Sequence, residues 1–149
     1  MFRIELHPWL AARALATSIR FKVFVEEQRV PVEIELDAQD ETSLHALAWT
    51  AQNDLVGTGR LLAAEGDGDR RVSHLGRMAV LAPWRGRGAG SAILRALVDA
   101  ARARGDAQVV LAAQVHALGF YRAHHFVEEG AEFLEAGIAH RLMRRALRG

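Results

Sequence analysis

The 149-residue sequence contains no cysteine, three prolines and a single tyrosine. Without cysteine the chain can form no disulfide, no thiolate metal site and no cysteine nucleophile. It also has no apolar run near the roughly 20 residues that span a bilayer. Its first residues carry an acid, Glu5, where a signal peptide would have an apolar stretch. We therefore expect a cytoplasmic protein without membrane contact, with the ordinary globular composition of 50% apolar and 25% charged residues.

The formal net charge of +1 hides an uneven distribution of charge along the chain. Residues 1–70 hold 7 basic and 12 acidic side chains, whereas residues 71–149 hold 12 basic and 6 acidic ones. The first half would attract a cationic ligand and the second half an anionic one, unless the split is the chance scatter of charge on a small globule. The length favours one domain over residues 1–149.

Hydrophobic periodicity predicts a mixed α/β order of elements. The expected order is a strand (2–6), one or two helices (9–25), an acidic loop (33–43), three antiparallel strands (44–51, 55–64, 71–81), an amphipathic helix (89 to about 104), a strand (108–113), a short helix (116–125) and one or two strands (126–147). Such an order is typical of a single α/β domain.

The segment 85–90, Arg-Gly-Arg-Gly-Ala-Gly, leads directly into the amphipathic helix. Glycines at a helix entrance let backbone N–H groups approach a ligand, and the positive end of the helix dipole favours an anion. Arg85 and Arg87 add two charges, so the segment predicts a phosphate site; a plain turn with solvated arginines is the alternative. The segment has no Lys for a P-loop, and Ser91 replaces the last glycine of a Rossmann fingerprint.

Arg85-x-x-Gly88-x-Gly90 resembles the Gln/Arg-x-x-Gly-x-Gly/Ala motif with which GNAT N-acetyltransferases hold the pyrophosphate of acetyl-CoA. Gly76–Val80 looks like the central strand of that family, and Phe120-Tyr121 followed by His125-Phe126 looks like its "FY…GF" segment, with His125 in place of Gly. Gly119 stands where an Asn is common. Four further segments resemble the ElaA-like branch: Val23–Gln28, Gly59–Leu61, Ala113–His116 and Gly137–His140.

The resemblance implies a GNAT (acyl-CoA N-acyltransferase) fold, with a mixed, mostly antiparallel sheet of about six to seven strands flanked by helices. It implies acetyl-CoA as co-substrate, no metal, and direct attack by a primary amine of a small-molecule acceptor. Nucleic acid is not an expected partner, and a homodimer is suggested only by analogy. The residues that would bind the cofactor are Met78, Ala79, Val80, Arg85, Gly86, Arg87, Gly88, Ala89, Gly90, Ser91 and Phe120.

By the same resemblance Tyr121 would be the general acid that protonates the departing thiolate; the alternative is an aromatic packed on the sheet. The general base is open between Glu26 and His116, with Glu27, His74 and His140 as further candidates. Two adjacent glutamates cannot share one helix face, so at most one of Glu26 and Glu27 should point inward.

Arg60 and Arg77 lie in apolar strands and must be paired, with acids from 33–41 as possible partners, or must line a cleft. Two rival functions also remain open. The first is a catalytically silent acyl-CoA-binding module on the same fold, and the second is a nucleotide-binding protein of another class.

Overall fold

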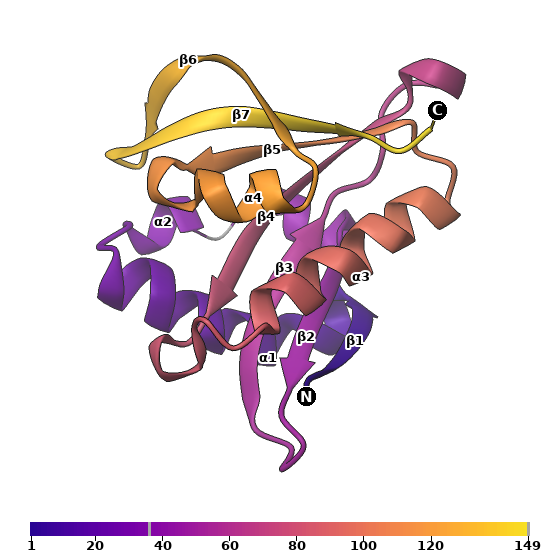
Figure 1. The fold of residues 1–149 in the computed structure, drawn as a ribbon. Coiled ribbons are helices and arrows are strands. Elements are labelled where there is room, and N and C mark those ends of the chain that lie inside the picture. The colour runs from indigo at the N-terminus through magenta and orange to yellow at the C-terminus, as the bar shows by residue number, and fades with distance from the viewer. Residues whose placement is uncertain (36, 149) are drawn as a thin grey trace.

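The computed structural model describes residues 1–35 and 37–148. Its strands form one seven-stranded sheet in the order β1-β2-β3-β4-β5-β7-β6 (Figure 1). All neighbouring strands are antiparallel except β4 and β5, which are parallel. This confirms the expected mixed, mostly antiparallel sheet. The strands are β1 (Arg3–Pro8), β2 (Leu44–Trp49), β3 (Leu55–Leu61), β4 (Val72–Val80), β5 (Gln108–Gln114), β6 (Val127–Glu135) and β7 (Ile138–Ala146).

The helices follow the expected order with some additional short elements. The longer ones are α1 (Trp9–Arg20), which continues as a π-helix η1 (Phe21–Glu27), and α3 (Ala89–Ala103). The short ones are α2 (Val32–Glu35), α4 (Leu118–Ala123) and the 3₁₀ turns η2 (Ala38–Thr42), η3 (Gly68–Arg70), η4 (Ala82–Trp84) and η5 (Val115–Ala117). Among these described elements, no helix is long and apolar enough to cross a bilayer.

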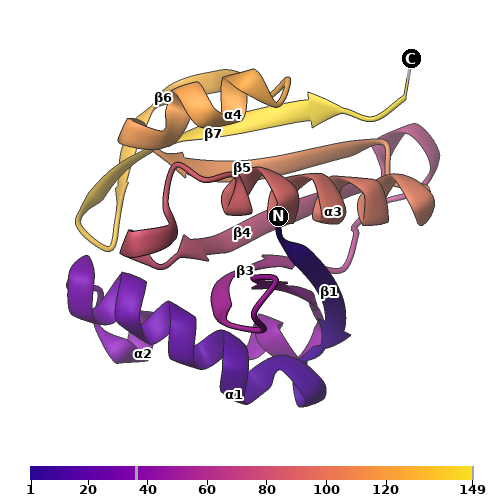
Figure 2. The same ribbon diagram turned by 60° about the horizontal axis from the view of Figure 1, so that its bottom comes forward.

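Helices cover both faces of the sheet because successive strand residues point to opposite sides. In β2, Leu47 packs with Ala12 and Ala16 of α1, whereas its neighbours Ala46 and Ala48 belong to the larger core that contains α3. Figure 2 shows α1 and α2 on one side of β2 and β3, with α3 on the other. A Cβ on Gly57 would lie 2.9 Å from Cδ1 of Ile93, so a glycine there lets α3 sit close to β3.

One expectation about the chain was wrong. The segment 33–43 is not an irregular loop, because it contains the end of α2 and the 3₁₀ turn η2, where Asp37 caps the turn by accepting a hydrogen bond from the Gln39 N–H. Strand β7 lies between β5 and β6, and Arg144 forms a two-bond ion pair with Glu129 of β6.

The sheet opens where β4 and β5 part. Their parallel pairing runs from Val72–Gln108 to Leu75–Leu111 and then stops, although β4 continues to Val80 and β5 to Gln114. Figure 2 shows the two strands separating toward the end of the sheet where α3 begins. Among the described residues, no strand pairs with the second half of β4 on its β5 side.

Candidate functional site

The glycine-rich segment forms the entrance of α3, as the sequence predicts. Gly86 and Gly88 have φ angles of 74° and 98°, a region that side chains other than glycine rarely adopt. A Cβ at either position would meet no atom within 4 Å, so the backbone conformation requires these glycines and the space in front of them is open. Gly88 precedes the helix without a side-chain cap, which leaves the first N–H groups of α3 available to an anion.

A cavity of about 390 Å³ opens at this loop. It is lined by the end of β4, the loop, the first turn of α3 and one ring of α4: Val80, Trp84, Arg85, Gly86, Gly88, Gly90, Ser91 and Phe120. All but Trp84 belong to the residues expected to bind a cofactor. The other expected residues do not line the cavity: Met78 and Ala79 lie further back along β4, Ala89 is buried, and Arg87 is exposed with its guanidinium over the Trp84 ring.

Arg85 is held by an acid from the N-terminal region. Its two terminal nitrogens lie 2.6 and 2.8 Å from the carboxylate oxygens of Glu27, and its Nε donates to the carbonyl of Val80 at 2.9 Å. The hydrogen bonds and charge of Arg85 keep the pKa of Glu27 below its usual value. Arg85 therefore joins η1 to the glycine loop, and Arg87 is the arginine of this segment that has no carboxylate partner among residues 1–35 and 37–148.

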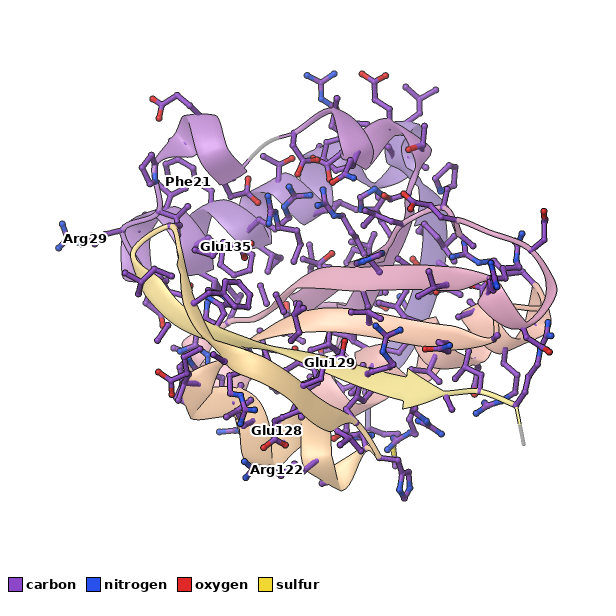
Figure 3. All side chains as sticks on the ribbon, turned by 90° about the horizontal axis from the view of Figure 1, so that it is seen from above. Phe21, Arg29, Arg122, Glu128, Glu129 and Glu135 are labelled. Atoms are coloured by element: carbon purple, nitrogen blue, oxygen red, sulfur yellow. The ribbon has the colours of Figure 1, made fainter. Side chains whose placement is uncertain are left out.

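Tyr121 lies beside this cavity, in the core under α4. Its ring packs edge-on against Phe120 and Phe126, with centroids 5.0 and 6.0 Å apart, and only 8% of the residue is exposed. Burial raises the pKa of the phenol to about 12, so the group is protonated at neutral pH. Arg122 anchors the same helix to β6 through a two-bond ion pair with Glu128; both residues are labelled in Figure 3.

The candidate bases differ in their surroundings. Glu26 and Glu27 are both exposed, and Glu27 is the one that contacts Arg85. His116 is also exposed, and its Nε2 lies 2.7 Å from the side-chain oxygen of Gln114. An amide oxygen only accepts, so Nε2 carries the proton and Nδ1 is the nitrogen that could accept one. Gln114 in turn pairs with Gln28, which follows η1, through hydrogen bonds of 2.9 and 3.3 Å.

The remaining histidine candidates have no comparable link to the site. His140 is buried, with its Nδ1 donating to the Ile138 carbonyl at 2.7 Å and its ring stacked on Phe133. His74 is exposed in the half of β4 that still pairs with β5. A histidine that the sequence did not single out, His124, lies 3.0 Å from the Ser91 hydroxyl at the edge of the cavity.

Arg60 and Arg77 are paired with acids from the 33–41 segment, which is one of the two alternatives that the sequence left open. Arg60 contacts Asp37 and Asp40, and Arg77 contacts Asp37. Burial raises the pKa of Asp40, but hydrogen bonds from Arg20 and Arg60 outweigh it and keep that pKa below its usual value. Three of the twelve acids of the first half are thus neutralised inside the protein, but Arg20 and Arg60 belong to the same half, so most of its acidic surplus remains.

A second cavity, of about 450 Å³, lies on the α1 face, between Trp9, Arg13 and Thr17 of α1 and Asp37 and Asp40 of the network just described. Its two aspartates are already paired with arginines. Within the described residues, no group of three or more His, Asp or Glu side chains is placed to hold a metal ion. The glycine loop is therefore the site with open ligand-binding groups.

Comparison with known proteins connects this geometry to a family. A family model described as an acetyltransferase (GNAT) domain matches residues 14–147. The curated protein "Uncharacterized N-acetyltransferase YjcF" of Bacillus subtilis is 38% identical over 123 residues, which cover 82% of this chain and 84% of that protein.

Solved structures are similar to this chain over nearly its whole length. A crystal structure of an acyl-CoA N-acyltransferase from Pseudomonas aeruginosa is 31% identical and superposes with a TM-score of 0.80, covering 98% of this chain and all of the other. Escherichia coli ElaA is 26% identical with a TM-score of 0.82, covering 97% of this chain and 99% of its own.

Proposed function

The chain belongs to the GNAT acetyltransferase family, and we propose that it transfers the acetyl group of acetyl-CoA to a primary amine of a small-molecule acceptor. The main support for the proposal is that the cavity at the glycine loop and the unpaired half of β4 adjoin each other at Val80. The cavity at the glycine loop reaches Val80 at the end of β4, and the unpaired half of β4 leads from there into the gap beside β5. One elongated ligand could occupy both, with its phosphates at the loop and its thioester in the gap.

The residues present fit such a ligand. Gly86 and Gly88 place open space in front of the helix entrance, and within the described part of the chain Arg87 has no carboxylate partner to compete with a phosphate. The role expected of Arg85 is revised: its guanidinium is taken up by Glu27 and Val80, so its contribution is to hold the loop against η1. Phosphate binding then rests on the backbone N–H groups and on Arg87.

The reaction needs no covalent intermediate with the protein. The amine nitrogen attacks the thioester carbonyl carbon, a C–N bond forms, and the C–S bond then breaks. Backbone N–H groups of Met78–Val80 would bind the pantetheine arm and stabilise the negative charge that develops on the carbonyl oxygen. Tyr121, protonated at neutral pH, would give its proton to the departing thiolate.

The proton released by the amine must be taken up on the acceptor side. His116 is the best placed of the two expected bases, because Gln114 fixes its ring and leaves Nδ1 able to accept. Glu26 is exposed on η1 and would act through water.

Calorimetric titration with acetyl-CoA tests the cofactor half of the proposal. The informative variant is Gly88→Ala, and the control is Gly130→Ala in β6, a second glycine of positive φ (79°) with open space around it. Both substitutions place a side chain at a φ above the left-handed helical region, but we expect only Gly88→Ala to weaken binding, by about tenfold or more. Equal affinity in the two variants, or no binding by the folded wild type, would contradict the proposed phosphate site.

A further inference from the structure

Strand β4 is irregular at Arg77, immediately before the segment Met78–Val80. The pairing with β3 passes from Thr58–Ala79 to Arg60–Gly76, so Arg77 and Met78 together face Gly59. This is a β-bulge, which bends a strand and redirects the residues that follow it. Arg77 has a φ of 50°, in the left-handed region that disfavours side chains other than glycine. Such a conformation persists only where the surrounding contacts impose it.

The guanidinium of Arg77 supplies contacts of this kind. Its Nη2 lies 3.1 Å from Oδ2 of Asp37, and its Nε donates to the backbone carbonyl of Glu35 at 3.2 Å. Glu35 is the last residue of α2, and Asp37 caps η2. The side chain of Arg77 therefore ties the bulge to a different element of the fold.

Asp37 is itself part of a chain of ion pairs. Arg60 of β3 reaches Asp37 at 2.8 and 3.1 Å and Asp40 at 2.9 Å, and Arg20 of α1 joins Asp40 to Glu35. Arg20, Glu35, Asp40 and Arg60 are each no more than 5% exposed. Moving one of these groups would leave a buried charge without its partner, so the network is a rigid support for Arg77.

The opposite face of the bulge is also fixed. A Cβ on Gly59 would lie 2.7 Å from Sδ of Met78 and 2.9 Å from Cγ2 of Ile93, so Met78 fills the space that the glycine leaves under α3. The bulge is thus held from both faces of the sheet. It begins two residues after Leu75, the last residue of β4 that pairs with β5.

We propose that Arg77 is a positioning residue for catalysis: through Asp37 and Glu35 it holds the bulge that directs the backbone N–H groups of Met78–Val80 toward the thioester. This inference rests on the proposed acetyltransferase function. An N–H group aimed at a developing oxyanion contributes about 10²–10³-fold to the rate. A displacement of about 1 Å can cost on the order of 10²-fold. The binding of the phosphates at the glycine loop does not depend on the bulge.

The test compares three variants. Arg77→Gly keeps a residue that accepts a φ of 50° but removes the guanidinium, so it separates the ion pairs from the backbone preference. Arg77→Lys restores one charged contact. Arg71→Ala is the matched control, because Arg71 also pairs with an aspartate, Asp106, at 2.7 Å, just before β4 begins.

For Arg77→Gly we expect kcat to fall by about 10- to 100-fold, with a smaller rise in the Kd for acetyl-CoA, because the contacts of its phosphates at the glycine loop are kept. The kcat of Arg77→Lys should lie between those of Arg77→Gly and the wild type, and Arg71→Ala should keep the wild-type kcat. Backbone amide NMR signals of Met78 and Ala79 should shift in Arg77→Gly and stay in place in Arg71→Ala.

A folded Arg77→Gly protein with wild-type kcat, or unmoved amide signals, would overturn the inference. So would an equal loss of kcat in Arg71→Ala. If Arg77→Gly does not fold, Asp37→Asn takes its place. This variant leaves the sequence of β4 unchanged and should produce the same loss of kcat. If the wild type binds acetyl-CoA but acetylates no amine, the proposed function fails, and the NMR comparison still decides whether Arg77 holds the bulge.

Discussion

Because Tyr121 is the only tyrosine in the chain, the ionisation of its phenol can be followed without interference from another residue. Tyrosinate absorbs in the near ultraviolet where the phenol does not. Burial among Phe120 and Phe126 raises the pKa of Tyr121 to about 12, against about 10 for an exposed tyrosine. At pH 10, about one folded molecule in a hundred should carry tyrosinate, compared with about half of the unfolded molecules.

The same difference in pKa has a consequence for stability. The folded state binds the phenolic proton more tightly than the unfolded state, so this contribution is fully present below pH 10 and is lost as the pH rises toward 12. Two pKa units correspond to about 3 kcal/mol of unfolding free energy. In Tyr121→Phe this part of the alkaline loss should disappear.

The assay is a pH jump from neutrality, with tyrosinate absorbance read before unfolding and the fluorescence of the three tryptophans reporting the folded state. The absorbance midpoint should lie near 12 for the folded protein and near 10 in denaturant. A folded-state midpoint near 10 would contradict the raised pKa of Tyr121, because it would mean that the phenol is in contact with water. A phenol exposed to water would also be less suited to the role of general acid.

Three further predictions concern named contacts. Tyr121→Phe should lower kcat by about 10²- to 10⁴-fold while leaving the Kd for acetyl-CoA unchanged, as steady-state kinetics and calorimetry will show. Gly59→Ala should destabilise the protein by about 1–3 kcal/mol in urea unfolding, because its Cβ would overlap Met78 and Ile93; a neutral effect would contradict the tight packing of α3 on β3. Burial raises the pKa of Asp106, but hydrogen bonds from Arg104 and Arg71 outweigh this effect and lower the pKa below 3.8. The stability that the ionised Asp106 contributes should therefore be lost as the pH falls through that range. Asp106→Asn should remove this acid sensitivity, as thermal melts between pH 3 and 6 would reveal.

The order of strands and helices could be predicted from the sequence because it depends on local patterns. Alternation and turn residues indicate β2 and β3, and the glycine-rich segment before an apolar stripe indicates the loop and α3. The resemblance to GNAT acetyltransferases added the position of β4 at the centre of the sheet, which the structure confirms.

Contacts between distant segments could not be predicted in this way. Glu27 and Arg85 are separated by 58 residues, and nothing local tells which of Glu26 and Glu27 pairs with that arginine. The acidic stretch 33–43 contains few apolar residues and so gave no helical signal, although its carboxylates are fixed by arginines from α1, β3 and β4. Nor does an arginine in an apolar strand indicate a bulge, since residues of positive φ are most often glycine.

Whether the protein acetylates an amine with acetyl-CoA can be measured by following the release of free CoA thiol. The chain contains no cysteine, so a thiol reagent reports CoA without background from the protein. A panel of small primary amines should include at least one that produces release above the rate without amine, dependent on Tyr121. Wild-type protein that binds acetyl-CoA but releases no thiol with any amine would contradict the proposed function and favour a silent acyl-CoA-binding module.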